Sequence, residues 1–412
     1  MRKEASGSLE SLRELNRERV VHTLRELGVA SRADIARRTG LSRSTVSSLV
    51  ADLRGEGLIV EMDSEHGPDG TAGQSGRPPV LIGLSPSAGA VGGIDFGKRH
   101  LAVAVSDLSH AILAEAWREM PEDYASADGL DTATELFDAA LDEAGVPRDR
   151  VLGVGLGLPG PIHRLTGTIG SPAILPGWVG VQVAEEMTSR LGLRVQVDND
   201  ANLGALSEFH WGAGRPTDSL AYLKVATGIG AGLIVSGRLF HGACGTAGEI
   251  GHTTVDEHGP ICRCGRRGCL ETFAAAPAVV ELLRPGLGPE LTIDDVLERA
   301  RQGDPGCQRA IADAGRHIGQ ALGNLCNLFN PERIVVGGSL GAAGELLLDP
   351  MREALGRAAI PSAADDVEIV PGVLGERAEL LGAIGLVLHE AEDVPEVGAG
   401  EHLGTATAAG AT

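Results

Sequence analysis

Aromatic residues and cysteines are scarce in this sequence: aromatics make up 3% of the 412 residues, and there are six cysteines. No apolar run approaches the roughly 18 residues that a membrane-spanning helix needs, so no membrane partner is expected. The first ten residues, MRKEASGSLE, lack the apolar core of a secretory signal, which predicts a cytoplasmic protein. In that reducing compartment, closely spaced cysteines indicate metal binding before disulfides.

An overall positive charge is also missing. The net charge of −21 argues against a general nucleic-acid coat protein. Residues 1–60, however, carry 11 Lys or Arg against 8 Asp or Glu, a net of +3, and the remaining residues carry −24. This asymmetry is compatible with a DNA-reading head on an acidic body.

The chain is long, and it is rich in apolar residues and glycine. A chain of 412 residues predicts two or three domains, and 43% hydrophobic residues suffice for sizeable cores. The 59 glycines favour tight turns and close backbone approaches, as in nucleotide-binding α/β proteins.

The N-terminal segment has the pattern of a helix-turn-helix. Residues 12–28 place leucines and valines at helical spacing, with Gly28 as a C-cap. Ser31 can cap a second short helix that ends at Gly40, and Ser42 can cap a third. Two short helices joined by a glycine turn are the arrangement in which the later helix enters the major groove of DNA.

The third predicted helix buries one face and leaves an arginine and short hydroxyl side chains on the other, which suits base edges and phosphates. The candidate DNA-binding residues on it are Ser42, Arg43, Ser44, Thr45, Ser47 and Ser48. Two strands, 58–63 and 80–85, enclose a glycine-rich tip, which would complete a winged helix with Arg77 reaching a phosphate or the minor groove. The alternative is a small helical oligomerisation module followed by a flexible linker.

From residue 90 onward, strands and helices alternate, with glycines at strand ends. Strands are expected near 91–97, 151–162, 195–200, 221–237 and 333–341, with helices over 132–144 and 310–329. This pattern predicts α/β sheets arranged as two lobes with a cleft between them. The expected domains are a winged helix-turn-helix over 1–86, a two-lobed ligand-binding domain over 87–392, and a disordered Gly/Ala/Thr-rich tail over 393–412.

The strongest local signal is the segment 249–271. His252, Cys262, Cys264 and Cys269 follow the pattern H-x9-C-x-C-x4-C, in which four N/S ligands lie close together around flexible glycines. These are the requirements of a tetrahedral zinc site, and the absence of an open coordination position predicts a structural metal. His258 could replace His252 as the fourth ligand. The alternative is a group of ordinary buried cysteines.

The same segment, with Glu249, His252 and Glu271 around the cysteines, resembles the signature of the ROK family of repressors, open reading frames and kinases. The resemblance extends over most of the chain, and the N-terminal winged helix is typical of the family's regulators. It implies an actin-like ATPase fold of two α/β lobes, a sugar in the cleft, and a homodimer or homotetramer.

The resemblance also implies roles for particular residues. The stretch VDNDAN matches the family's strand-end motif, so Asn199 would bind a sugar hydroxyl and Asp200 would be the general base of a kinase. Glu249, His252 and Glu271 would complete the hydroxyl-binding ring, with one nitrogen of His252 on zinc and the other facing the sugar. Asp200 could equally be a helix N-cap.

The phosphate-binding parts resemble the family's kinases less closely. The resemblance implies a phosphate and nucleotide set for Mg²⁺ and ATP, comprising Asp95, Gly97, Thr227, Gly228, Gly230, Gly337 and Gly338. The first loop departs from the kinase pattern Asp-Ile-Gly-Gly-Thr-Lys, because Lys98 and Arg99 replace its second glycine and threonine. These long side chains are expected to crowd ATP or to imitate its counter-charge. Ile174 stands where the kinases have a sugar-binding asparagine.

Three functions are therefore open. The first is a sugar-responsive regulator of transcription, most simply a repressor of carbohydrate genes, that binds double-stranded operator DNA and a small sugar or sugar phosphate. The second is a working ATP-dependent sugar kinase that also binds DNA. The third is a structural or partner-binding protein with an empty cleft. The altered phosphate loop favours the first function, and the retained Asp200 keeps the second open.

Overall fold

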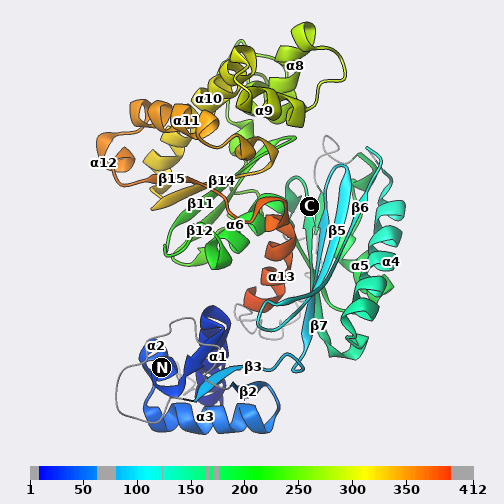
Figure 1. Cartoon of the computed structure of the whole chain (residues 1–412), viewed down its shortest axis with the longest axis vertical. Coiled ribbons are helices and arrows are strands. Elements are labelled where there is room, and N and C mark those ends of the chain that lie inside the picture. The colour runs from blue at the N-terminus through cyan, green and yellow to red at the C-terminus, as the bar shows by residue number, and fades with distance from the viewer. Residues whose placement is uncertain (1–8, 63–79, 123, 164–166, 170–175, 391–412) are drawn as a thin grey trace, which may run out of the picture.

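The computed structural model describes residues 9–62, 80–122, 124–163, 167–169 and 176–390 (Figure 1). Arg77, Ile174 and the tail after residue 392 lie outside these residues. No helix in the described part of the chain combines the length and the apolar character that crossing a membrane requires.

The N-terminal domain is a winged helix, as the caps predict. Its elements are α1 (Leu9–Leu27), β1 (Val29–Ser31), α2 (Arg32–Thr39), α3 (Arg43–Gly55), β2 (Ile59–Met62) and β3 (Leu81–Leu84). Ser31 and Ser42 accept hydrogen bonds from the third backbone N–H beyond each, and Gly40 adopts the left-handed conformation that ends α2. The short strand β1, which pairs with β3 and gives the sheet order β1-β3-β2, was not predicted.

The first lobe of the body is a five-stranded sheet in the order β10-β7-β4-β5-β6. Its strands are β4 (Ala90–Phe96), β5 (His100–Asp107), β6 (Ile112–Glu119), β7 (Val151–Leu158) and β10 (Val195–Asn199). The helices α4 (Ser126–Ala144) and α5 (Val183–Leu191) pack on this sheet, and the hairpin β8 (Ile162–His163) and β9 (Thr168–Ile169) follows β7. The predicted helix 132–144 therefore begins earlier, at Ser126.

The second lobe repeats this topology. Its sheet has the order β13-β12-β11-β14-β15, formed by β11 (Leu220–Val225), β12 (Ile229–Val235), β13 (Arg238–Leu239), β14 (Arg333–Gly337) and β15 (Glu368–Pro371). In both lobes, the first three strands are antiparallel neighbours and the last two add in parallel. This duplicated arrangement is the predicted two-lobed actin-like fold.

Helices cover the second sheet on the side away from the first lobe (Figure 1). They are α7 (Glu271–Ala274), α8 (Ala276–Leu287), α9 (Ile293–Arg301), α10 (Pro305–Phe329), α11 (Glu345–Ala358) and α12 (Pro361–Ala364). The predicted helix 310–329 corresponds to α10, which begins at Pro305, and α7 to α9 were not predicted. Buried residues of α10 and α11 share one hydrophobic core with β11, β12 and β14.

Two helices lie between the lobes, and one of them also packs against the winged helix. α6 (Asp200–Trp211) packs on the second sheet and α13 (Ala378–Glu390) on the first, and the two helices pack against each other. A single core contains Leu380, Ile384 and Leu388 of α13 together with Val20 and Leu24 of α1. The winged helix therefore rests on the helix that also lies between the lobes (Figure 1).

Candidate functional site

The outer face of α3 carries the predicted DNA-binding side chains. Arg43, Ser44, Ser47 and Ser48 are exposed, whereas Val46, Leu49, Val50 and Leu53 on the opposite face are buried. The Ser42 hydroxyl lies 2.8 Å from the hydroxyls of both Ser44 and Thr45 and accepts from the Thr45 N–H, so it is engaged in capping α3. The first turns of α3 thus present the Arg43 guanidinium and several hydroxyl groups, a suitable surface for a major groove.

The cleft between the lobes is built around the turn from β10 into α6. Asn199 caps α6 by accepting from the Ala201 N–H, and its side-chain amide donates to the Gly160 carbonyl at 2.7 Å. Asp200 begins the helix, so its carboxylate lies where the helix dipole favours negative charge. Its Oδ1 accepts from Ala201 as well. The N-cap of α6 is therefore Asn199 and not Asp200, as the alternative expectation had it, and both residues border the cleft pocket.

A buried lysine that sequence reasoning missed holds Asp200 in place. Lys224 of β11 donates to Asp200 Oδ2 at 2.9 Å and lies 3.1 Å from Glu379 Oε1 in the first turn of α13. Burial would lower the pKa of Lys224, but the charges of Asp200 and Glu379 outweigh it and raise that pKa, so the ammonium stays charged. The expected general base is thus already ion-paired.

The other predicted sugar-binding residues line the same cleft. Glu249, His252 and Glu271 border one pocket together with Asn199 and Asp200. Burial, and then the nearby charges of Asp200 and Glu271, raise the pKa of Glu249 to about 7. Glu249 can therefore exchange between donating and accepting a hydrogen bond near neutral pH, which suits recognition of hydroxyl groups.

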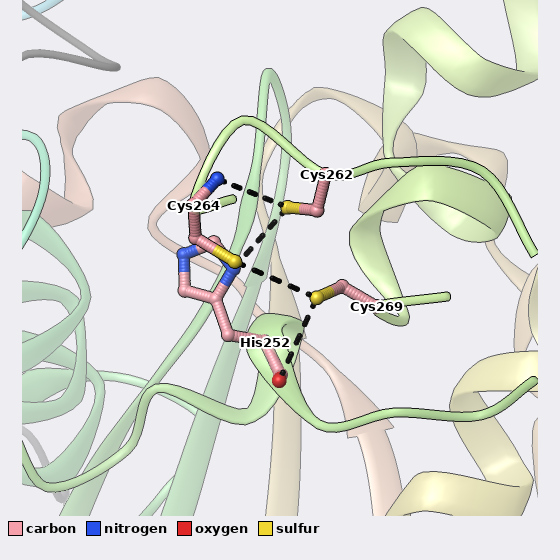
Figure 2. Close-up of side chains that lie close together, drawn as sticks. All are labelled: His252, Cys262, Cys264 and Cys269. Carbon is pink, nitrogen blue, oxygen red and sulfur yellow. Dashed lines mark hydrogen bonds between the residues drawn. The ribbon is translucent and has the colours of Figure 1, made fainter. Parts of the chain in front are cut away.

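His252 also belongs to a cluster of four side chains that could hold a metal ion (Figure 2). Its Nδ1 lies 3.6 Å from Cys262 Sγ, and Cys264 Sγ lies 3.7 Å from Cys269 Sγ. All four ligand atoms lie within 4.8 Å of one another. Ligands about 2.0–2.3 Å from a tetrahedral metal are separated by about 3.5–3.8 Å, so this donor set fits a metal ion such as zinc.

The cluster geometry also distinguishes the two histidines that the sequence left open. His258 has a side chain that is 94% exposed and lies 3.9 Å from Asp256, outside the cluster. His252 instead directs Nδ1 toward the cysteines, while its Nε2 lies 3.9 Å from Glu249 Oε2 in the cleft. The cluster and the cleft therefore share this imidazole ring.

The first phosphate loop, between β4 and β5, differs from the expectation. Lys98 and Arg99, expected to crowd ATP or imitate its counter-charge, are both paired with Glu122. Instead, the ring of His100, the first residue of β5, lies against the loop, with Nε2 2.9 Å from Asp95 Oδ2 and so close to Gly97 that a Cβ there would overlap it. The sequence did not predict a role for His100, because its contact with Asp95 forms only in the folded hairpin of β4 and β5.

The second phosphate loop follows β11. Thr227, Gly228 and Gly230 line the cleft pocket as expected. Arg263, which stands between two of the cysteines, crosses the loop, since a Cβ on Gly228 would meet its guanidinium. The same guanidinium donates to both oxygens of Glu271, at 3.0 and 2.7 Å. Arg263 was missed because its neighbours suggested only a metal knuckle.

The two glycines expected on the adenosine side lie at the end of β14. Gly337 pairs with Lys224 across the sheet, and a Cβ on it would collide with the Tyr222 hydroxyl. Gly338 has a φ of +81° and packs against the backbone of Val225. Packing alone therefore requires glycine at both positions, so these residues do not by themselves identify a nucleotide.

Comparisons with known proteins cover both parts of the chain. The ROK family model matches residues 91–390, and the MarR family model matches residues 19–67. The xylose repressor of Caldicellulosiruptor bescii is 30% identical over 405 residues, which cover 95% of this chain and 99% of that protein.

Two solved structures extend the likeness. A ROK family transcriptional regulator described as a homolog of the E. coli MLC protein has a TM-score of 0.75 at 25% identity, covering 92% of this chain and 96% of its own. A ROK family glucokinase from Streptomyces griseus, in complex with glucose and AMPPNP, has a TM-score of 0.65 at 30% identity, covering 72% and 99%. The lobes repeat one topology, and His252 belongs to both the cleft and the cysteine cluster. Together with these features, the matches establish that the chain belongs to the ROK family.

Proposed function

We propose that this protein is a sugar-responsive transcriptional repressor of carbohydrate genes. The observation that carries the proposal is α13, whose Glu379 pairs with Lys224 of the cleft and whose Leu388 belongs to the core of the winged helix. One helix thus contacts both a residue of the sugar-kinase-like cleft and the DNA-binding head. The likeness to a xylose repressor over 95% of the chain supports the same reading.

The winged helix is the proposed operator-binding part. The exposed residues Arg43, Ser44, Ser47 and Ser48 would contact the major groove, with Thr45 and Ser42 at the helix start. Arg77, outside the described residues, is proposed to contact a phosphate or the minor groove. In a homodimer or homotetramer, two such heads would bind two operator half-sites. We propose the domain limits 1–86 and 87–392, with residues 393–412 as a tail.

The cleft is the proposed site for a free, uncharged sugar. Asn199, Asp200, Glu249, His252 and Glu271 offer an amide, carboxylates and an imidazole, which suit sugar hydroxyls. Its two cations are already paired, Lys224 with Asp200 and Glu379, and Arg263 with Glu271. A phosphorylated sugar would add negative charge beside Lys224 and Arg263, which among the described residues of the pocket are both already paired with carboxylates.

The cluster of His252, Cys262, Cys264 and Cys269 is the proposed structural zinc site. The separations of 3.6 and 3.7 Å between ligand atoms support this assignment. Zinc on Nδ1 of His252 would fix the ring so that Nε2 faces the cleft, which makes sugar affinity depend on the metal.

Phosphoryl transfer is not part of the proposal, because the residues present do not fit Mg²⁺ and ATP. The ring of His100, the first residue of β5, lies against the first loop at Gly97 and pairs with Asp95, the residue that would face the metal. Lys224 likewise holds the carboxylate of Asp200 that would accept the proton from a sugar hydroxyl. Both acidic groups of a kinase site are therefore engaged with side chains of this chain.

Coupling would work by a population shift. A sugar hydroxyl that binds Asp200 competes with Lys224, and Lys224 also contacts Glu379 at the start of α13. Any displacement of α13 changes the surface on which α1 packs. The sugar can shift the position of the winged helix only by as much as it prefers one arrangement over the other.

A thermal-shift screen with common sugars, each with and without Mg·ATP, tests the cleft assignment. We expect one free sugar to raise the melting temperature of the wild-type protein and to leave that of Asn199→Ala unchanged. Mg·ATP should add nothing. Stabilisation that grows with Mg·ATP, together with phosphorylated product, would instead identify a working sugar kinase.

A further inference from the structure

A second cavity lies between the winged helix and the body, away from the sugar cleft. It encloses about 420 Å³ and is lined by Arg25 of α1, Arg38 of α2, His110 of the β5–β6 turn, Trp211 of α6 and His389 of α13. The volume falls within the usual range of small-molecule sites, about 300–1,000 Å³. Because its walls come from both domains, an occupant would contact the DNA-binding head and the sensor at once.

Histidine side chains gather at this cavity with unmet hydrogen-bonding capacity. Both ring nitrogens of His389 and the Nε2 of His110 are buried and have no hydrogen-bond partner among the residues that the structure describes. The rings of His389 and His210 stack in parallel with centroids 3.8 Å apart, and His110 packs against Trp211 at 4.4 Å. Buried polar atoms in native proteins normally have partners, so these nitrogens indicate a missing acceptor such as a bound anion.

The charges around the cavity favour an anion as well. Arg25, Arg38 and Arg215 line it, against Asp218 and Glu332. One of those carboxylates is already engaged, because Glu332 accepts from two backbone N–H groups. In a chain with a net charge of −21, this is a local concentration of positive charge.

The pKa shifts of two histidines agree with the positive charge around the cavity. Burial, followed by the charges of Arg25 and His210, lowers the pKa of His110 to about 3. Burial, followed by the nearby His210, His110 and Arg25, also lowers the pKa of His389. Both rings are therefore neutral at pH 7, so each carries one N–H that can donate to an anionic oxygen.

We propose that this interdomain cavity binds a phosphate monoester of a small metabolite. Arginine and imidazole N–H groups are suitable donors for phosphate oxygens. The cavity exceeds the size of phosphate alone, and the rings of Phe209 and Trp211 offer a surface for the organic part. The binding site itself is independent of the proposed function, whereas its effect on operator affinity rests on that function.

The consequence would be a second input to the regulator. The Arg25 guanidinium donates to the Leu388 carbonyl, so the cavity lies beside a direct contact between α1 and α13. A phosphate ester held between these helices would stabilise the docked position of the winged helix. Operator affinity would then depend on a free sugar in the cleft and a phosphorylated one at the domain interface.

Tryptophan fluorescence of the full-length protein tests the site, because Trp211 borders the cavity. The probes are inorganic phosphate, glucose 6-phosphate and glucose, each at constant ionic strength set with sodium chloride. We expect a saturable change with glucose 6-phosphate, and at least tenfold weaker binding in the double variant His110→Gln/His389→Gln. A response to inorganic phosphate alone would contradict the metabolite assignment.

Asn199→Ala separates this site from the cleft. It should leave the glucose 6-phosphate response unchanged while removing any response to free glucose. Loss of both responses in Asn199→Ala, or equal affinity in the histidine double variant, would overturn the proposal. If the double variant does not fold, hydrogen exchange on the wild-type protein decides, since glucose 6-phosphate should protect residues 209–218 and 386–390 rather than 199–204.

Discussion

Replacing Lys224 by methionine should destabilise the body of the protein and reveal how the cleft is held together. The ammonium lies between Asp200 and Glu379 at 2.9 and 3.1 Å, and its side chain is only 20% exposed. Methionine fills much the same volume but leaves two partly buried carboxylates without a cation. Removing one partner of a buried ion pair costs about 3–5 kcal/mol. Asp200 faces the cleft and can be hydrated, so we expect a loss of about 3 kcal/mol.

Thermal melting followed by circular dichroism measures this effect. For a large domain, about 3 kcal/mol corresponds to a decrease in Tm on the order of 6 °C or more. The chain offers a matched control, because one of its three lysines, Lys98, forms a surface pair with Glu122. Lys98→Met should change the free energy of unfolding by less than about 1 kcal/mol.

A double variant distinguishes charge pairing from simple loss of packing. Burial raises the pKa of Glu379, and Lys224 opposes that shift, so Glu379→Gln removes the carboxylate that suffers most from losing the lysine. We expect Lys224→Met/Glu379→Gln to be less destabilised than the sum of the two single variants. Strict additivity, or a Lys224→Met protein as stable as wild type, would refute the ion-pair account.

Three further predictions concern the other parts of the molecule. Arg43→Ala should weaken operator binding about tenfold or more in an anisotropy titration and leave sugar affinity unchanged, since Arg43 is exposed on α3 far along the chain from the cleft. Cys264→Ser should lower bound zinc and sugar affinity together by elemental analysis and calorimetry, whereas the exposed Cys244→Ser outside the cluster should change neither. Burial lowers the pKa of His100, but the hydrogen bond to Asp95 and the charge of Asp95 raise this pKa overall. The contribution of His100 to stability is therefore fully present below pH 6.5 and is lost as the pH rises through the raised pKa. The difference in Tm between wild type and His100→Gln should therefore shrink with rising pH, and a constant difference would contradict this.

Local signals in the sequence predicted local structure well. The helix caps at Ser31 and Ser42 and the turn at Gly40 follow from short-range hydrogen bonding and backbone sterics, which a few neighbouring residues determine. The cysteine spacing similarly predicted a compact cluster, because its members are near in the chain. The residues expected to bind sugar also line one pocket, although their ligand remains a proposal.

Contacts between residues far apart in the chain could not be predicted from the sequence. Glu379 reaches Lys224 only because α13, which follows the second lobe in the chain, returns between the lobes. The pairing of His100 with Asp95 depends on the antiparallel hairpin of β4 and β5, which faces the two side chains toward each other. The strand β1 is too short to show a pattern of its own and exists by pairing with β3.

We propose that one chain binds operator DNA and responds to a sugar without phosphorylating it. The decisive experiment is fluorescence anisotropy of a DNA fragment from upstream of its own gene, titrated with the full-length protein and a panel of free sugars. We expect one sugar to change operator affinity at least tenfold, Asn199→Ala to lose this response, and Mg·ATP to have no effect. DNA binding that ignores every sugar, while the protein converts a sugar and ATP to a sugar phosphate, would refute the proposal.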